Sequence, residues 1–169
     1  MSKHPRVMQL VGFSDSGKTT LLTKLIPLLQ GEGLRVGVIK HDGGHDFELD
    51  QPGKDTWRYR EAGASLVAIS SQTKTAIIEQ QPLPLEQLVE RMAQAGADLV
   101  LVEGFKQAGY PKLLLVRKQE DRELLDTLAN VAAIVSWGEL EHAALPVFPL
   151  DDAEAIASFI MQRSGESRT

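Results

Sequence analysis

The residues from Gly12 to Thr19 carry the clearest chemistry in the chain. They read GFSDSGKT and match the spacing G-x-x-x-x-G-K-[ST], which is typical of loops that bind nucleotide phosphates. Gly12 and Gly17 permit a tight turn whose backbone N–H groups point at the phosphates, where a Cβ would block the approach. Lys18 would reach the β- and γ-phosphates, and the Thr19 hydroxyl would bind Mg²⁺. An ordinary glycine turn is the alternative, but the apolar run before the motif and the amphipathic run after it favour phosphate binding.

A magnesium site beside such a loop needs a carboxylate, and the segment ADLVLVEGF offers Asp98 and Glu103. Ligands bind beyond the carboxyl ends of parallel strands, so Glu103, at the end of this apolar run, is the predicted metal ligand. Asp98 begins the run, about 16 Å away at roughly 3.3 Å per residue, and is expected to be structural. Asp42, after the run VGVIKH, is a second metal candidate. His41 beside it could bond a phosphate or a partner.

Two groups of basic residues also follow apolar runs. Lys54 and Arg58 lie four apart on one expected helix face, a spacing that could clamp an anion. A solvated helix with ordinary ion pairs is the alternative. Lys106 and Lys112 follow Glu103 and predict a basic surface beside the nucleotide site, despite the acidic total charge.

The elements that must position these residues alternate along the chain. Apolar runs predict strands at 6–11, 35–41, 98–104, 112–117 and 130–136, and a hairpin over 66–78. Helical spacing of apolar residues predicts helices within 19–33, 54–64, 83–96 and 151–163. The pattern predicts an α/β fold, a mostly parallel sheet with helices on both faces and one antiparallel hairpin. The length of 169 residues fits a single domain over 1–169, with a frayed tail at about 164–169.

Composition excludes several classes of protein. The net charge of -5 and the pI near 5.4 argue against general nucleic-acid binding, which leaves a basic footprint. The absence of cysteine excludes disulfides, thiolate zinc sites and iron–sulfur clusters. The sequence shows neither a signal peptide nor an apolar run long enough to span a bilayer. We therefore expect a cytoplasmic protein that binds no membrane.

Three segments together resemble one family, the molybdopterin-guanine dinucleotide biosynthesis protein B (MobB) family. They are GFSDSGKTTLLTKLIPLL, VGVIKHDGGHDFELDQPGKDTWRYREAGA, and LVLVEGFK with YPKLLLVR, and the likeness covers roughly residues 5–160. The resemblance implies a three-layer P-loop NTPase fold, GTP and Mg²⁺ as ligands, weak GTPase activity, and a homodimer whose two sheets join. It also implies a guanylyltransferase partner, which attaches GMP to molybdopterin and so forms the guanine dinucleotide form of the molybdenum cofactor.

The resemblance also assigns residues. The nucleotide would contact Gly12, Ser14, Asp15, Ser16, Gly17, Lys18, Thr19 and Thr20. The segment KHDGGHDFELDQPGKDT matches the family signature and is the expected face toward molybdopterin, the molybdenum cofactor or the partner. With neighbouring basic residues, the candidates on this face are His41, Asp50, Lys54, Asp55, Arg58 and Lys106. The N-K-x-D element by which many GTPases read guanine is absent from the sequence, and Asp151 or Asp152 is the candidate contact for the base edge.

The expected mechanism is in-line attack of water on the γ-phosphate. Lys18 and Glu103 are the predicted catalytic residues, with the loop N–H groups and Mg²⁺ stabilising the charge. The sequence identifies no catalytic glutamine and no arginine finger, so turnover should be slow. The main alternative is a small-molecule kinase using ATP, but the arginines available for its lid show no clear grouping. Those arginines are Arg58, Arg60, Arg117 and Arg122. A module that binds nucleotide only as a structural ligand is a third possibility.

Overall fold

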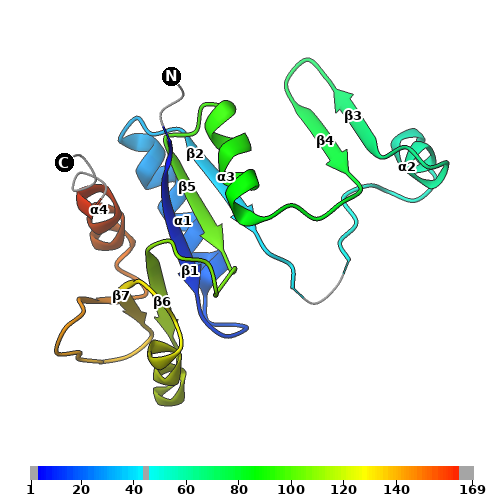
Figure 1. Cartoon of the computed structure of the whole chain (residues 1–169). Coiled ribbons are helices and arrows are strands. Elements are labelled where there is room, and N and C mark those ends of the chain that lie inside the picture. The colour runs from blue at the N-terminus through cyan, green and yellow to red at the C-terminus, as the bar shows by residue number, and fades with distance from the viewer. Residues whose placement is uncertain (1–3, 44–45, 164–169) are drawn as a thin grey trace. The chain divides into compact units, whose positions relative to one another are not determined.

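Strands and helices alternate in the computed structural model, which describes residues 4–43 and 46–163 (Figure 1). In chain order the elements are β1 (Arg6–Val11), α1 (Lys18–Gly31), β2 (Val36–Lys40), α2 (Asp55–Glu61), β3 (Leu66–Ser70), β4 (Thr75–Glu79), α3 (Leu85–Gln94), β5 (Leu99–Glu103), β6 (Lys112–Val116), a 3₁₀ helix (Gln119–Asp126), β7 (Val131–Ser136), β8 (Val147–Pro149) and α4 (Ala153–Arg163). The tail predicted at 164–169 lies outside the described residues.

Six strands form one parallel sheet in the order β2-β5-β1-β6-β7-β8. The strand β1 is central, with β5 on one side and β6 on the other. The chain runs from β1 outward to β2, returns through β5, and then crosses β1 to reach β6. In open α/β sheets this reversal leaves a crevice at the carboxyl ends of the strands, where ligands bind. The prediction of a mostly parallel sheet is confirmed.

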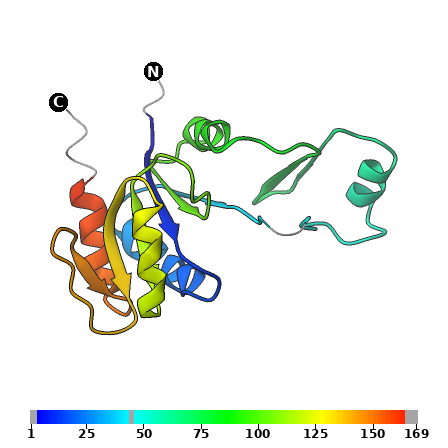
Figure 2. The same ribbon diagram turned by 60° about the horizontal axis from the view of Figure 1, so that its bottom comes forward.

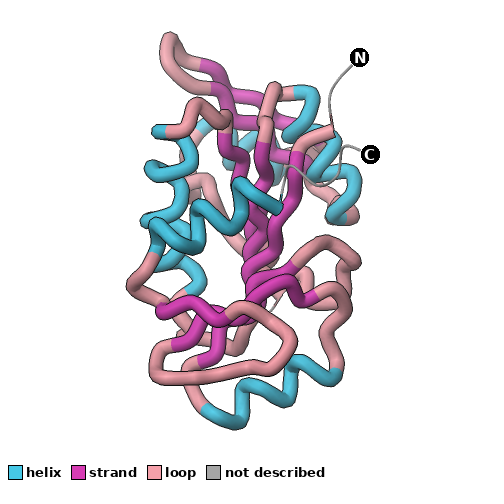
Figure 3. The backbone as a smooth tube through the Cα atoms, turned by 90° about the vertical axis from the view of Figure 1, so that its left-hand side faces the viewer, coloured by secondary structure: helices cyan, strands magenta, loops and turns pink. Residues whose placement is uncertain are grey.

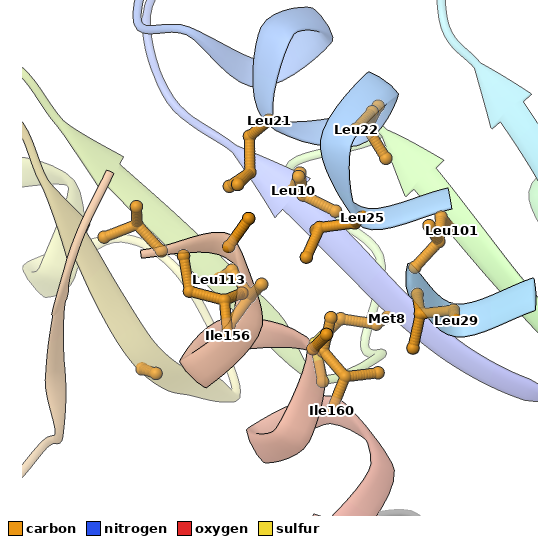
Figure 4. Packing of buried hydrophobic residues seen from close by; sticks show 14 of the residues in the cluster. Met8, Leu10, Leu21, Leu22, Leu25, Leu29, Leu101, Leu113, Ile156 and Ile160 are labelled. Carbon is orange, nitrogen blue, oxygen red and sulfur yellow. The ribbon is translucent and has the colours of Figure 1, made fainter. Parts of the chain in front are cut away.

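Helices cover both faces of this sheet because β5, β6 and β7 are mostly apolar and buried on both sides. On one face, α1 and α4 pack on the sheet through residues such as Leu10, Leu25 and Ile156 (Figure 4). On the other face, α3 packs against Val100 and Val102, and the 3₁₀ helix packs against neighbouring strands. Figure 3 shows the strands between these helices. No helix among residues 4–43 and 46–163 is long and apolar enough to cross a membrane.

Two elements were not predicted from the sequence. The strand β8 has only three residues and ends in Pro149, too short a run for any periodicity to show; it pairs with β7 in parallel. The 3₁₀ helix is polar, and Asp121 within it is buried. The Asp121 carboxylate accepts hydrogen bonds from the backbone N–H groups of Arg117, at 2.7 Å, and Lys118, at 2.9 Å. This turn therefore depends on a side-chain contact rather than on an apolar pattern.

The segment Asp42–Pro84 forms a second compact unit, separate from the unit that carries the parallel sheet. It contains α2 and the predicted hairpin, whose strands β3 and β4 form a two-stranded antiparallel sheet of their own (Figure 2). Arg60 of α2 donates to Glu48 at 2.7 Å and lies 3.8 Å from Asp50, which ties the loop before the helix to it. Whether the whole chain folds as one domain stays a prediction.

Candidate nucleotide-binding site

The loop between β1 and α1 has the form that its glycines predict. Gly12 is buried, and a Cβ built there would lie 2.7 Å from the Ser16 hydroxyl and 3.0 Å from the carbonyl oxygen of Leu115, so a side chain at this position would require both neighbours to shift. Gly17 has a φ of 94°, which other residues rarely adopt. A larger residue at either position would therefore strain the loop. The turn leads directly into α1, whose positive end faces the loop.

Lys18 lies over this loop. Its Nζ donates to the carbonyl oxygen of Phe13 at 2.7 Å, and to the carbonyl oxygen of Gly12 and the hydroxyl of Ser16, both at 3.3 Å. Burial lowers the pKa of Lys18 below that of a free lysine. These three acceptors are neutral, so a phosphate here would give the ammonium group a better partner than the loop does.

Thr19 and Glu103 face each other across adjacent elements. The Thr19 hydroxyl donates toward the two carboxylate oxygens of Glu103 at 3.3 and 3.4 Å. Glu103 ends β5, directly beside β1, and its carboxylate also lies 3.7 Å from Lys40 Nζ. The described residues contain no group of three or more His, Asp or Glu side chains that could hold a metal. A hydroxyl and one carboxylate nevertheless suit Mg²⁺, which takes its remaining ligands from phosphates and water.

One aromatic and one basic side chain, neither of them predicted from the sequence to contact the phosphate loop, also hold the loop in place. Trp137 Nε1 donates to the carbonyl oxygen of Ser16 at 2.7 Å. Arg117 donates to the carbonyl oxygen of Asp15 at 3.1 Å, and its guanidinium lies 4.8 Å from the centre of the Trp137 ring. Each residue follows the last residue of a strand, β6 or β7. The strand-end rule that selected Glu103 could therefore have selected both.

These residues surround a cavity of about 580 Å³. Its lining contains Ser14, Asp15, Ser16, Gly17, Lys18, Thr19, Thr20, Lys40, His41, Glu103, Trp137 and Leu150. The structure thus brings together the predicted loop residues, the predicted acid and His41. Gly12, the first residue of the loop, is buried and is not among these lining residues. Lys106 lies beside the loop, with Nζ 5.0 Å from the centre of the Phe13 ring.

The prediction that Lys112 belongs to a basic surface beside the nucleotide site is wrong. Lys112 is fully buried at the start of β6, and its Nζ donates to the backbone carbonyls of Ala108, of Tyr110 at 3.1 Å and of Ala129 at 2.9 Å. Burial lowers its pKa. Its charge is therefore solvated by the protein interior and is not available to a ligand at the surface.

Asp98 has the structural role expected of it. Its carboxylate accepts a hydrogen bond from the backbone N–H of Arg35 at 2.9 Å, at the amino end of the sheet. This is the end opposite to the phosphate loop, because Asp98 precedes β5 and Glu103 ends it.

The other predicted residues lie in the second unit. Asp50 accepts a hydrogen bond from Thr56 at 2.8 Å, and Lys54 is the residue before α2. Asp42, Lys54, Asp55 and Arg58 are exposed. The metal role of Asp42 and the cofactor or partner face stay predictions.

The loop that follows Glu103 is held in an unusual backbone conformation. Gly104 has a φ of 92° and Phe105 a φ of 52°. Gln9, fully buried, donates from Nε2 to the carbonyl oxygens of Gly104 at 2.9 Å and Phe105 at 2.8 Å. The Phe105 ring stacks on His41 with centroids 4.5 Å apart. These contacts fix the backbone immediately after the predicted metal ligand.

Replacing Gly104 with alanine should therefore destabilise the protein. The positive φ costs about 1–3 kcal/mol for a residue with a side chain, and the new Cβ would lie 3.1 Å from His41 Cβ. Urea unfolding measures the difference. Gly31→Ala is the matched control: Gly31 ends α1 with no atom within 4 Å of a built Cβ, so stability should hold or rise by up to about 1 kcal/mol. Equal stability of Gly104→Ala and the wild type would contradict the observed loop conformation.

A phosphate loop after the central parallel strand, with a hydroxyl and an acid meeting beside it, defines the class of P-loop nucleotide-binding proteins. Within that class, the model of the family "MobB: Molybdopterin guanine dinucleotide synthesis protein B" matches residues 7–137. The chain belongs to the MobB family.

Individual relatives agree with this membership. The chain is 35% identical over 164 residues to a "Probable molybdopterin-guanine dinucleotide biosynthesis adapter protein" of Bacillus subtilis (strain 168), with 95% of each chain covered. It is 41% identical over 143 residues to the "Molybdopterin-guanine dinucleotide biosynthesis adapter protein" of Haemophilus influenzae, covering 83% of this chain and 80% of that protein. The crystal structure of Bacillus subtilis MobB superposes with a TM-score of 0.81 at 32% identity, covering 94% of this chain and 97% of that one.

Proposed function

We propose that this protein binds GTP with Mg²⁺ and acts as an accessory protein in forming the guanine dinucleotide form of the molybdenum cofactor. Its partner would be the guanylyltransferase that attaches GMP to molybdopterin. The proposal of GTP and Mg²⁺ binding rests on one observation: the Thr19 hydroxyl donates to the Glu103 carboxylate beside the phosphate loop that contains Lys18. The pathway part is supported by the names of the adapter proteins to which the chain is similar. The cytoplasmic location expected from the sequence is part of this proposal.

The residues of the site support binding more strongly than fast hydrolysis. Loop N–H groups and the Lys18 ammonium would neutralise the β- and γ-phosphates, while Thr19 and Glu103 would hold Mg²⁺, which further offsets the phosphate charge. The described lining of the cavity contains no glutamine and no arginine. Arg117 lies nearby but is bound to Asp15 and stacked on Trp137. We therefore propose a weak GTPase whose turnover rises when a partner supplies the missing groups.

Isothermal titration with GTP and with ATP, each with Mg²⁺, tests the proposal, and hydrolysis is measured in parallel. Tighter binding of GTP, slow turnover, and acceleration by the guanylyltransferase are the expected results. Preference for ATP, with ADP released only when a small-molecule substrate is added, would favour the kinase instead. Turnover equal to that of a Lys18→Ala variant would favour a module that uses nucleotide only as a structural ligand.

We further propose that the protein is a homodimer joined through the β3–β4 hairpin. These two strands form a sheet by themselves, and a two-stranded sheet is marginal in water without further cover. Leu66 is 61% exposed, Ile69 54% and Ile77 67%, so the hairpin presents unusually much apolar surface. The pairing register places Leu66 and Ile77 on one face of the hairpin and Ile69 on the other. A second copy of the hairpin packed on the face of Leu66 and Ile77 would cover these two side chains.

Replacing Ile77 with lysine should shift this dimer toward monomer. Burying one isoleucine contributes about 1.5–3 kcal/mol, and a two-fold interface uses the residue twice, so the dissociation constant should rise roughly 100-fold or more. Light scattering coupled to size exclusion measures the mass. Thr73→Lys adds the same charge in the hairpin turn without removing an apolar side chain, and should leave the dimer intact. A monomeric wild type at tens of micromolar would rule the dimer out.

A further inference from the structure

A second cavity, of about 240 Å³, adjoins the phosphate cavity. The two share Thr20, Trp137 and Leu150 in their linings, and the smaller one is completed by Leu21, Lys24 and Asp151. Glu103, Lys40 and His41 line only the larger cavity. The smaller cavity therefore extends from the side of the phosphate loop that is away from the metal acid.

The direction of the loop indicates what part of a nucleotide would lie there. In this motif the lysine, here Lys18, contacts the β- and γ-phosphates, and the hydroxyl of the next residue, here Thr19, binds the metal ion. The chain continues from there to Thr20, on the side shared by both cavities. A nucleotide whose γ-phosphate lies near Glu103 would accordingly place its ribose and base beyond Thr20, in the smaller cavity.

The walls of this cavity suit a flat ring with polar edges. The Trp137 side chain and Leu150 form an apolar wall, and both lie within 3.3 Å of a Cβ built on Gly17, so this wall is continuous with the phosphate loop. Asp151 places a carboxylate in the lining and Lys24 an ammonium group. Apolar walls with a few charged groups at defined positions are typical of small-molecule sites.

We infer that Asp151 reads the base of the bound nucleotide as guanine, an inference that rests on the proposed GTP-binding function. The carboxylate of Asp151 accepts hydrogen bonds, and guanine offers two donors side by side on one edge, N1–H and the 2-amino group. Adenine offers a lone pair at N1, which a carboxylate repels. Lys24 complements this choice, because guanine carries an acceptor at O6 where adenine carries an amino group.

Asp151 and its neighbour Asp152 have different surroundings in the structure. Asp152 accepts a hydrogen bond from the backbone N–H of Ala155 at 3.1 Å, and so caps the amino end of α4. Asp151 is exposed and lines the cavity. Two adjacent aspartates that look equivalent in the sequence thus have different surroundings.

Replacing Asp151 with asparagine tests the inference by changing which base the side chain can bind. Xanthine carries an oxygen where guanine carries its 2-amino group, so it needs a donor at that position instead of an acceptor. An asparagine amide donates to that oxygen and accepts from N1–H, so Asp151→Asn should bind XTP more tightly and GTP more weakly, each by roughly 10- to 100-fold. Binding of GTP, XTP and ATP is measured by titration with Mg²⁺. Asp152→Asn is the matched control: asparagine caps a helix as well as aspartate does, so its preference should remain that of the wild type.

The outcomes separate this inference from the proposed function. A wild type that prefers GTP, together with an unchanged preference in a folded Asp151→Asn variant, overturns the role of Asp151 and leaves GTP binding in place. A switch to XTP in Asp152→Asn also overturns it. A wild type without preference for GTP overturns the proposed function itself. Asp151→Ala gives a second test: its preference for GTP over ATP should fall at least 10-fold, with only the contribution of Lys24 remaining, and an undiminished preference would contradict the inference.

Discussion

Replacing Lys18 with alanine is expected to weaken nucleoside triphosphate binding by roughly 100-fold or more, about 3 kcal/mol. Its ammonium group lies over the phosphate loop on three neutral acceptors, the nearest at 2.7 Å. A phosphate would replace these with a charge-assisted contact in a partly water-excluded site, where such contacts are strong. Titration calorimetry with GTP and Mg²⁺ measures the loss, and circular dichroism shows whether the variant remains folded.

Lys106→Ala is the control for Lys18→Ala. Lys106 is also a cation beside the loop, over the Phe13 ring, but it makes no hydrogen bond to the loop in the described structure. Its removal should weaken binding only a few-fold, through long-range charge. Equal losses in the two variants would mean that general positive charge, rather than the position of Lys18, holds the nucleotide. Full affinity in Lys18→Ala would remove Lys18 from the site altogether.

Replacing Glu103 with glutamine is expected to remove the part of the affinity that depends on Mg²⁺. Glutamine keeps the shape of the side chain and can still accept a hydrogen bond from Thr19, but it lacks the charge that Mg²⁺ prefers. The Glu103 side chain is only 12% exposed, so little water can screen or replace its charge. GTP affinity with Mg²⁺ should fall roughly 10- to 100-fold, toward the value measured in the presence of a chelator, and hydrolysis should fall with it.

Asp98→Asn is the matched control for Glu103→Gln. Glu103 is the last residue of β5, whereas Asp98 precedes the strand at its amino end, where its carboxylate accepts a hydrogen bond from the backbone N–H of Arg35. Asparagine can accept the same hydrogen bond, so this variant should bind GTP and Mg²⁺ as the wild type does. If the GTP affinity of Glu103→Gln is still higher with Mg²⁺ than with a chelator, by the same factor as in the wild type, then Glu103 does not hold the metal.

Local signals in the sequence are sufficient for the phosphate loop and for the elements on either side of it. The spacing of Gly12, Gly17 and Lys18 encodes a turn in which the hydrogen bonds of Lys18 all go to residues of the loop itself. The apolar runs predict parallel strands, and the rule that ligands lie at the carboxyl ends of such strands predicts Glu103 over Asp98. These inferences need only residues close in the chain or their position within one strand, and the structure places them as expected.

The roles of other residues depend on the order of strands in the sheet, which the order of elements along the chain does not reveal. Lys112 follows Glu103 by nine positions and looks like part of a basic surface, yet carbonyls from Ala108, Tyr110 and Ala129 converge on it in the interior. Trp137 lies 121 positions from Ser16, but donates to its carbonyl oxygen. Only the folded sheet brings such distant segments together.

The sequence by itself thus determined the family, the α/β class, the phosphate loop and the acid opposite it, because each depends on a local pattern. The tertiary structure decided which charged residues are available to a ligand. It buried Lys112, assigned Asp152 to the cap of α4, left Asp151 in a cavity beside the loop, and left the β3–β4 hairpin as a sheet of its own. The physical reason is that burial and hydrogen-bond partners are set by contacts between segments distant in the chain, which no local pattern contains.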